Sequence, residues 1–252
     1  METWGLDPPR LLHNTKQTVQ KFNGCNDVLL STRNPDRFII DGYLPSPNNN
    51  KHKHIPTLVG FRHYSGDTPI TYTGSRTESI WSADLSPNGT RLVSGEENAG
   101  VEVFDTRSGK ELTSFRAYSE TEAAGFDWIE DVEFYNGGNK IVTTMTISRT
   151  MKFWEAETGE LIDTVALRNH PESIDVSEKH DLLVYGSEKS IGFLSLNDLE
   201  VLWTDQIHDD SINSVRFSPD GTYIATGSGE DHDEEGFRDY SIKLWKTPNV
   251  WD

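Results

Sequence analysis

The sequence SINSVRFSPDGTYIATGS, at residues 211–228, decides the fold. It reads as an alternating strand, a Pro219-Asp220-Gly221 turn and a second strand of β-branched residues that ends in glycine. Residues 79–95, SIWSADLSPNGTRLVSG, repeat this pattern closely. Residues 128–144 repeat it more loosely, and residues 172–187 more weakly again. The chain is therefore predicted to consist largely of recurring β-hairpins.

The spacing of the hairpins indicates a larger repeat. The last apolar residues before the turns are Leu85, Phe134, Val176 and Phe217, which are 49, 42 and 41 residues apart. A four-stranded propeller blade takes about 40–45 residues. A predicted third strand follows each hairpin, at 101–105, 151–155, 191–195 and 242–246, and a fourth follows the first three of these. A β-sandwich has no reason to repeat at this interval.

The combination of SPDG at 218–221, TRLVSG at 90–95 and IKLW at 242–245 resembles the WD-repeat β-propeller family. The resemblance covers residues 79–252. It implies an all-β fold, a β-propeller of four-stranded antiparallel blades, of which about five are visible. It also implies that an N-terminal strand closes the ring by pairing with the last blade, which removes exposed sheet edges.

The domain organisation follows from these repeats. Residues 17–252 form a single propeller and residues 1–16 an N-terminal extension. The expected closing strand is QTVQKF at 17–22. An open ring that a partner completes is the alternative, because the last repeat supplies three strands. The blades are expected at roughly 26–74, 79–116, 128–166, 172–204 and 211–246.

Composition restricts the function. The chain of 252 residues holds 41 acidic and 23 basic residues, a formal net charge of −18. This acidic protein would repel phosphates, so binding to nucleic acid or to an anionic membrane is not expected. One cysteine, Cys25, excludes an intramolecular disulfide. With no long apolar run and no signal peptide, we expect an intracellular protein of the cytoplasm or nucleus.

One group of polar residues in the last blade matches the family's buried hydrogen-bonded tetrad. Its members are His208, Thr226, Asp239 and Trp245. Asp, His and a hydroxyl also suggest a hydrolase triad, but the chain lacks a Gly-x-Ser-x-Gly elbow. The resemblance implies a structural tetrad, so no catalytic residue and no enzyme activity are predicted.

Cofactor and metal sites have no support in the sequence. There is neither a phosphate-binding Gly-x-x-x-x-Gly-Lys-Ser/Thr loop nor a dinucleotide-binding Gly-x-Gly-x-x-Gly in a strand-to-helix context. His52 and His54 could contribute to a metal site, which needs about four convergent ligands, and His232 lies among carboxylates. Solvated charged loops are the preferred interpretation, so no cofactor and no metal are predicted.

Without chemistry, the resemblance implies that the protein is a non-enzymatic scaffold for protein–protein interactions within a multiprotein complex. The alternative is a substrate receptor of a cullin-RING ubiquitin ligase, because Phe-Asp-Thr-Arg at 104–107 is similar to the signature of such receptors. Arg107 would then contact the adaptor while Asp105 holds it. A five-bladed glycoside hydrolase is a third alternative, from another class, which the repeats do not favour.

Two features suggest where a partner docks. An acidic stretch in the last blade would attract a basic segment, and two tryptophans at the starts of neighbouring first strands would supply contact area. We therefore predict a docking surface for a Lys/Arg-rich partner segment. Its residues are Trp81, Trp128, Glu230, Asp231, Asp233, Glu234 and Glu235.

Overall fold

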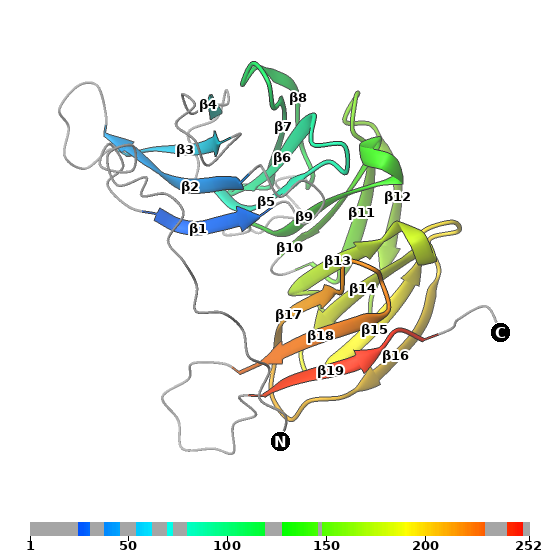
Figure 1. Cartoon of the computed structure of the whole chain (residues 1–252). Coiled ribbons are helices and arrows are strands. Elements are labelled where there is room, and N and C mark those ends of the chain that lie inside the picture. The colour runs from blue at the N-terminus through cyan, green and yellow to red at the C-terminus, as the bar shows by residue number, and fades with distance from the viewer. Residues whose placement is uncertain are drawn as a thin grey trace.

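In the computed structural model, most of the described backbone belongs to antiparallel sheets. The structure describes residues 25–30, 38–45, 54–61, 70–72, 80–118, 128–145, 148–229 and 241–248. The sheets follow one another around a ring, each formed by strands that are consecutive in the chain (Figure 1). This architecture confirms the predicted all-β propeller of four-stranded antiparallel blades.

The described residues form four complete blades and a fifth sheet of three strands, where about five blades were predicted. The strands of the first three sheets are β1 (Cys25–Leu30), β2 (Phe38–Pro45), β3 (His54–Phe61), β4 (Ile70–Tyr72); β5 (Ile80–Leu85), β6 (Arg91–Glu96), β7 (Gly100–Asp105), β8 (Glu111–Arg116); and β9 (Ile129–Tyr135), β10 (Lys140–Met145), β11 (Thr150–Glu155), β12 (Leu161–Ala166). The remaining two sheets contain β13 (Ser173–Ser177), β14 (Leu182–Ser187), β15 (Ser190–Ser195), β16 (Val201–Gln206); and β17 (Ile212–Phe217), β18 (Tyr223–Ser228), β19 (Ile242–Lys246).

The turns between first and second strands follow the sequence chemistry. In the SPDG turn, Gly221 takes a φ of +71°, and the Asp220 carboxylate accepts hydrogen bonds from the Ser218 hydroxyl and the Thr222 amide. The equivalent turns of the third and fourth sheets are short 3-10 helices, Asn136–Gly138 and Glu178–His180. A turn of different sequence thus joins the same pair of strands.

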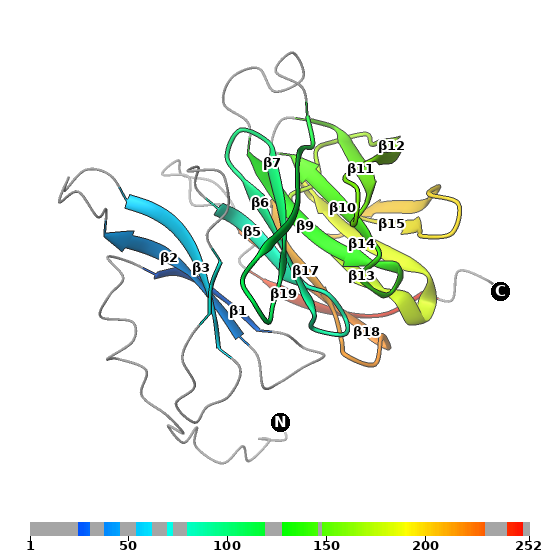
Figure 2. The same cartoon turned by 90° about the horizontal axis from the view of Figure 1, so that it is seen from above.

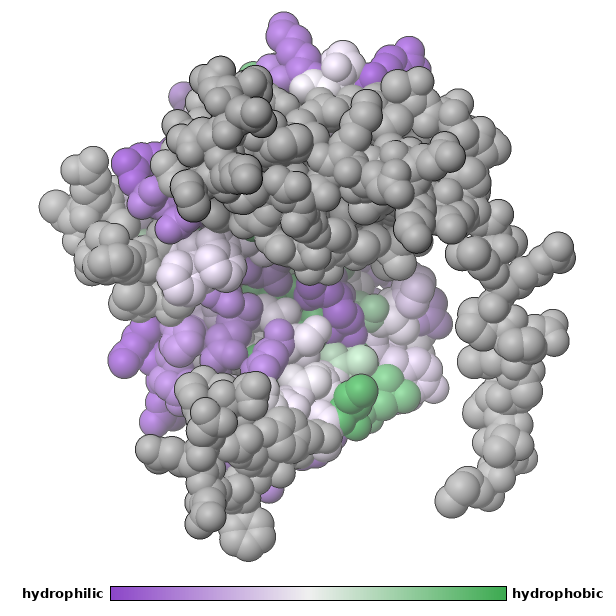
Figure 3. Space-filling model, turned by 90° about the vertical axis from the view of Figure 1, so that its left-hand side faces the viewer, coloured by the Kyte–Doolittle hydropathy of each residue, from purple (hydrophilic) through white to green (hydrophobic). Residues whose placement is uncertain are grey.

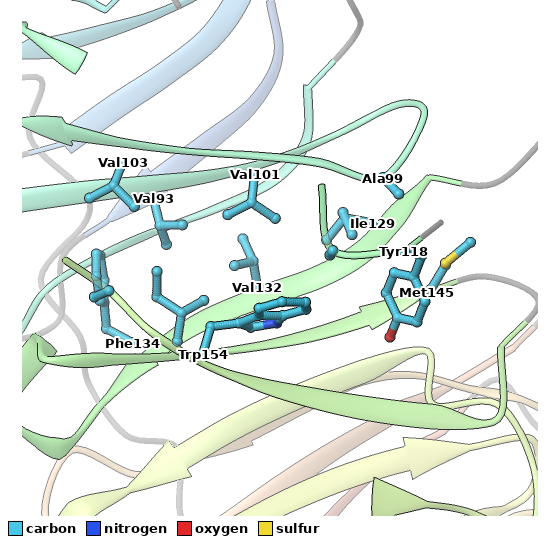
Figure 4. Packing of buried hydrophobic residues seen from close by; sticks show 13 residues of the cluster. Val93, Ala99, Val101, Val103, Tyr118, Ile129, Val132, Phe134, Met145 and Trp154 are labelled. Atoms are coloured by element: carbon cyan, nitrogen blue, oxygen red, sulfur yellow. The ribbon is translucent and has the colours of Figure 1, made fainter. Parts of the chain in front are cut away.

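The cores lie between neighbouring sheets. Third-strand side chains Val101 and Val103 of one blade pack against Val132 and Phe134 in the first strand of the next, with Trp154 beside them (Figure 4). Corresponding clusters fill the interfaces that follow. Each blade therefore buries the third strand of the blade before it, which gives the repeating sequence its apolar pattern.

Among the described residues, no following blade covers the third strand of the last sheet. Ile242 and Leu244 are 85% and 69% exposed, whereas their counterparts in the third strands of the three preceding sheets are fully or almost fully buried. Those counterparts are Val101, Val103, Met151, Phe153, Ile191 and Phe193. The predicted closing strand, residues 17–22, lies outside the described residues, as does the extension 1–16.

The first sheet contacts the second through its last strand. β4 connects the first sheet to the second through Tyr72, which packs on Phe104 and donates a hydrogen bond to the Thr106 carbonyl at 3.0 Å. In Figure 2 the strands β1–β3 lie apart at one side, whereas β17–β19 overlap the central sheets in this view. Figure 3 shows that one side of the molecule carries mostly hydrophilic surface with a compact apolar patch.

Candidate functional site

The first strands of successive blades carry a charged residue at one shared position. It is the residue before the aligned apolar position, and it is Asp84, Glu133, Asp175 and Arg216 in β5, β9, β13 and β17. Asp131, two residues before Glu133, joins the same group. Because these strands lie side by side, four carboxylates from three blades converge on one arginine.

Three of these carboxylates tie neighbouring blades together. Asp84 Oδ2 accepts the Phe134 amide at 2.8 Å, and Asp131 Oδ2 accepts the Ile174 amide at 3.0 Å. Asp175 Oδ2 accepts the amide of Phe217 in the same way. Each bond runs from a backbone N–H to the carboxylate of the preceding blade. We call this set of three bonds the interblade tethers.

Arg216 offsets part of the accumulated negative charge. Its Nη1 donates to the Ile174 carbonyl at 2.6 Å and lies 3.9 Å from oxygens of both Asp131 and Glu133. Burial is the main cause that raises the pKa of Asp84, to about 7, against the backbone hydrogen bonds that lower it. Burial likewise raises the pKa of Glu133 and Asp175, and the neighbouring carboxylates add to the effect.

Three of the four carboxylates accept hydrogen bonds from the backbone of the next blade, and the fourth lies beside Arg216. A glycosidase needs one carboxylic acid and one carboxylate facing the scissile bond. Here Asp84, Asp131 and Asp175 accept interblade hydrogen bonds, and Glu133 lies beside Arg216. Among the described residues, no group of three or more His, Cys, Asp and Glu could hold a metal ion.

Three predicted tetrad residues meet inside the last sheet. His208, 2% exposed, places Nε2 at 2.8 Å from the Thr226 hydroxyl, which also accepts the Trp245 indole N–H at 3.0 Å. The Ser241 hydroxyl lies 3.3 Å from His208 Nδ1. Asp239, the fourth predicted member, lies outside the described residues. The buried Thr226 hydroxyl thus links the His208 and Trp245 rings within the last sheet.

The third sheet has a related set of hydrogen-bonded side chains that the sequence pattern did not indicate. Trp154 Nε1 donates to the Thr143 hydroxyl at 3.0 Å, as Trp245 does to Thr226. Tyr118 takes the place of His208 and packs under the Lys152 ammonium, which lies 4.2 Å from the ring centroid. Lys152 Nζ donates to the Ala117 carbonyl, as Lys243 Nζ donates to the Ile207 carbonyl.

The two predicted docking tryptophans do come together. Trp81 in β5 and Trp128, just before β9, stack with ring centroids 4.6 Å apart and planes at 15°. Trp81 is 53% exposed. Trp128 Nε1 donates to Glu130 Oε2 at 3.0 Å. The acidic residues predicted to lie beside them, Glu230, Asp231, Asp233, Glu234 and Glu235, are outside the described residues.

Comparisons with known proteins agree with this geometry. The family model described as "WD domain, G-beta repeat" matches residues 66–105 and 199–246. The first matched segment contains β4 and β5–β7, and the second contains β16 and the whole last sheet, β17–β19. The chain folds as a β-propeller and carries two segments that match the WD repeat.

Relatives of this WD-repeat chain share between 23% and 26% of aligned residues. Eukaryotic translation initiation factor 3 subunit I of Culex quinquefasciatus is 25% identical over 214 residues, 79% of this chain and 58% of the relative. WD repeat-containing protein 36 of Homo sapiens is 23% identical over 167 residues, 66% of this chain and 17% of the relative.

A third relative matches a shorter segment. Pre-mRNA-processing factor 19 of Schizosaccharomyces pombe is 26% identical over 113 residues, 45% of this chain and 22% of the relative. This WD-repeat chain therefore spans between about a sixth and about three fifths of the lengths of these relatives. In the part of the chain that the structure describes, no helix has the length and apolarity to cross a membrane.

The Asp105–Arg107 segment of the propeller forms a turn. Asp105 Oδ1 accepts the Ser108 hydroxyl at 2.6 Å and the amides of Ser108 and Arg107 at 2.7 and 3.2 Å. These hydrogen bonds lower the pKa of Asp105, and the bond from the Ser108 hydroxyl has the largest effect. Glu155 starts the corresponding turn of the next blade, where the Gly159 amide donates to its carbonyl. The Asp105 carboxylate is therefore engaged with its own turn.

The charged group on the first strands was missed by the sequence reasoning, although a signal was present. Asp84, Glu133, Asp175 and Arg216 each precede the apolar residue by which the WD repeats were aligned. Charged residues at the same position of four repeats are predicted to lie at the same height on neighbouring first strands. Nothing in the spacing, however, shows that a carboxylate reaches the backbone of the following blade.

Proposed function

We propose that this WD-repeat propeller is a non-enzymatic scaffold that binds other proteins as part of a multiprotein complex. The observation that carries the proposal is the Trp81–Trp128 stack, in which Trp81 is exposed on β5 and Trp128 lies just before β9 of the next blade. Tryptophan dominates the binding energy of many protein interfaces because its large surface is desolvated on contact. Exposing such a pair on a rigid ring favours recognition of a partner.

The braces and tethers support this role. A binding surface gains affinity when its residues are ordered before the partner arrives, since less conformational entropy is lost on binding. Hydrogen bonds from Phe134 and Ile174 to carboxylates of the preceding blades order the strands beside the tryptophans. One relative, moreover, is named as a subunit of a translation initiation factor.

The test is the state of the protein in its native cell extract. A scaffold is expected to elute in gel filtration far above the position of a 28.5 kDa chain and to carry partner proteins in constant proportion. Quantitative mass spectrometry of the affinity-purified protein would identify them. Elution as a free 28.5 kDa species, with no protein in constant proportion, would contradict the proposal.

A further inference from the structure

The stacked tryptophans form a preorganised surface. Trp81 comes from β5 and Trp128 immediately precedes β9, so each indole belongs to a different blade. Trp128 is held on two sides, because its backbone forms a β-bridge with Glu97 and its Nε1 donates to Glu130. The Trp81 ring rests on the Trp128 ring and keeps about half of its surface exposed.

The residues bordering this stack are acidic. Glu97 is exposed and lies opposite Trp128 in the bridge, whereas Glu96, which pairs with Ile80 next to Trp81, is buried. Glu130 Oε2 accepts the Trp128 indole N–H at 3.0 Å. An indole face attracts a cation through its quadrupole, and nearby carboxylates add a direct attraction. The surface therefore fits a positively charged, planar group.

We propose that Trp81 and Trp128, with Glu97 and Glu130, dock an arginine-bearing segment of a partner protein. The proposal rests on the scaffold function and names its partner chemistry. A guanidinium stacks flat on an indole while the N–H groups in its plane bond a carboxylate bidentately, whereas an ammonium is a compact charge without a flat face. A nucleic-acid base could also stack on Trp81, but the phosphates beside it would meet Glu97 and a chain of net charge −18.

The experiment uses the full chain and three synthetic twelve-residue peptides, followed by isothermal titration calorimetry. One peptide carries three arginines among glycine and serine, a second replaces each arginine by neutral citrulline, and a third by glutamate. We expect binding of the arginine peptide only, with affinity falling several-fold between about 50 and 200 mM salt.

Matched variants locate the site. Trp81→Ala is expected to weaken the arginine peptide by about tenfold, the loss of one desolvated cation–π contact. Trp203→Ala removes another half-exposed indole, 46% exposed on β16, and should leave binding unchanged. The double variant Glu97→Gln, Glu130→Gln should bind more weakly and flatten the salt dependence. Circular dichroism melting would verify that each variant is folded.

Several outcomes would overturn the proposal. These are no binding of the arginine peptide, equal binding of the citrulline peptide, equal losses in Trp81→Ala and Trp203→Ala, or tighter binding of a single-stranded oligonucleotide. The scaffold function fails separately. If the native complex persists while no arginine peptide binds, this docking surface is wrong and the scaffold stands. If the arginine peptide binds but the native protein elutes without partners, the docking surface stands and the scaffold function is wrong.

Discussion

At the scale of single residues, the propeller depends on hydroxyls and carboxylates that each serve two elements. Thr226 bonds both His208 and Trp245, and Asp131 bonds both its own strand and the amide of Ile174. Buried polar atoms are costly when they lose a partner. Small changes at these positions should therefore have large effects on stability.

Thr226→Val keeps the volume of the side chain but removes the oxygen shared by two buried rings. We expect a loss of about 1–3 kcal/mol in unfolding free energy, because His208 and Trp245 each lose a hydrogen bond. Urea denaturation followed by tryptophan fluorescence measures it. Thr143→Val, which removes the bond to Trp154, is the matched variant and should cost less. Equal losses would show that the bond to His208 contributes nothing.

Asp84 makes stability depend on pH. Its pKa is about 7 in the folded protein, against an ordinary value of 3.8, so between these values the folded state binds the proton more tightly. Unfolding free energy should therefore fall as pH rises from about 4 to 7. Asp84→Asn is expected to reduce this slope, and chemical denaturation at several pH values measures it.

The control for the pH dependence is Asp220, whose pKa hydrogen bonds from Ser218 and Thr222 lower to about 2. A lowered pKa gives stability that is present at neutral pH and lost only in acid, below about pH 4. Asp220→Asn should therefore leave the slope between pH 5 and 7 unchanged. An Asp84→Asn variant with the wild-type slope would contradict the assignment.

At the scale of elements, hairpins were predicted well and contacts between blades were not. The SPNG turn predicted the β5–β6 hairpin and the SPDG turn predicted the β17–β18 hairpin, because turn residues and alternation are local signals. The first blade was expected to begin near residue 26, and its first strand, β1, spans Cys25–Leu30. The Tyr118 hydrogen bond to Thr150 and the interblade tethers join residues about 30 to 50 positions apart in the chain. Periodicity along the sequence does not reveal such contacts.

The β2–β3 hairpin allows a direct test of an inserted loop. Its register continues to the Pro45–His54 pair, and residues 46–53 between these two lie outside the described residues. Replacing 46–53 by Asn-Gly should change the melting temperature by less than about 2 °C, since a type I′ turn suits two paired strands. A drop of many degrees in differential scanning calorimetry would show that the loop is packed.

At the scale of the whole molecule, the uncovered face of the last sheet stands out. Three preceding sheets bury their third strands under the next blade, whereas Ile242 and Leu244 remain exposed in β19. Within the described residues β19 pairs with β18 alone, so its outer edge has backbone groups available for another strand. An exposed apolar edge is a hazard for aggregation.

Two truncations test whether residues 17–22 close the ring. Removal of 1–16 should leave the melting temperature unchanged, because this extension is predicted to lie outside the propeller. Removal of 1–22 should lower it by several degrees and increase light scattering, because β19 would lose its predicted partner. Calorimetry with light scattering measures both. Identical behaviour of the two truncated proteins would reject the closing strand.

The interblade tethers also set an order of assembly during synthesis. Each carboxylate acceptor leaves the ribosome before its donor: Asp84 precedes Phe134, Asp131 precedes Ile174, and Asp175 precedes Phe217. Domains fold as they emerge, starting from the N-terminus. A finished blade thus offers an anchoring point to the strand that emerges next, so the nascent chain can build the ring one blade at a time and in one direction.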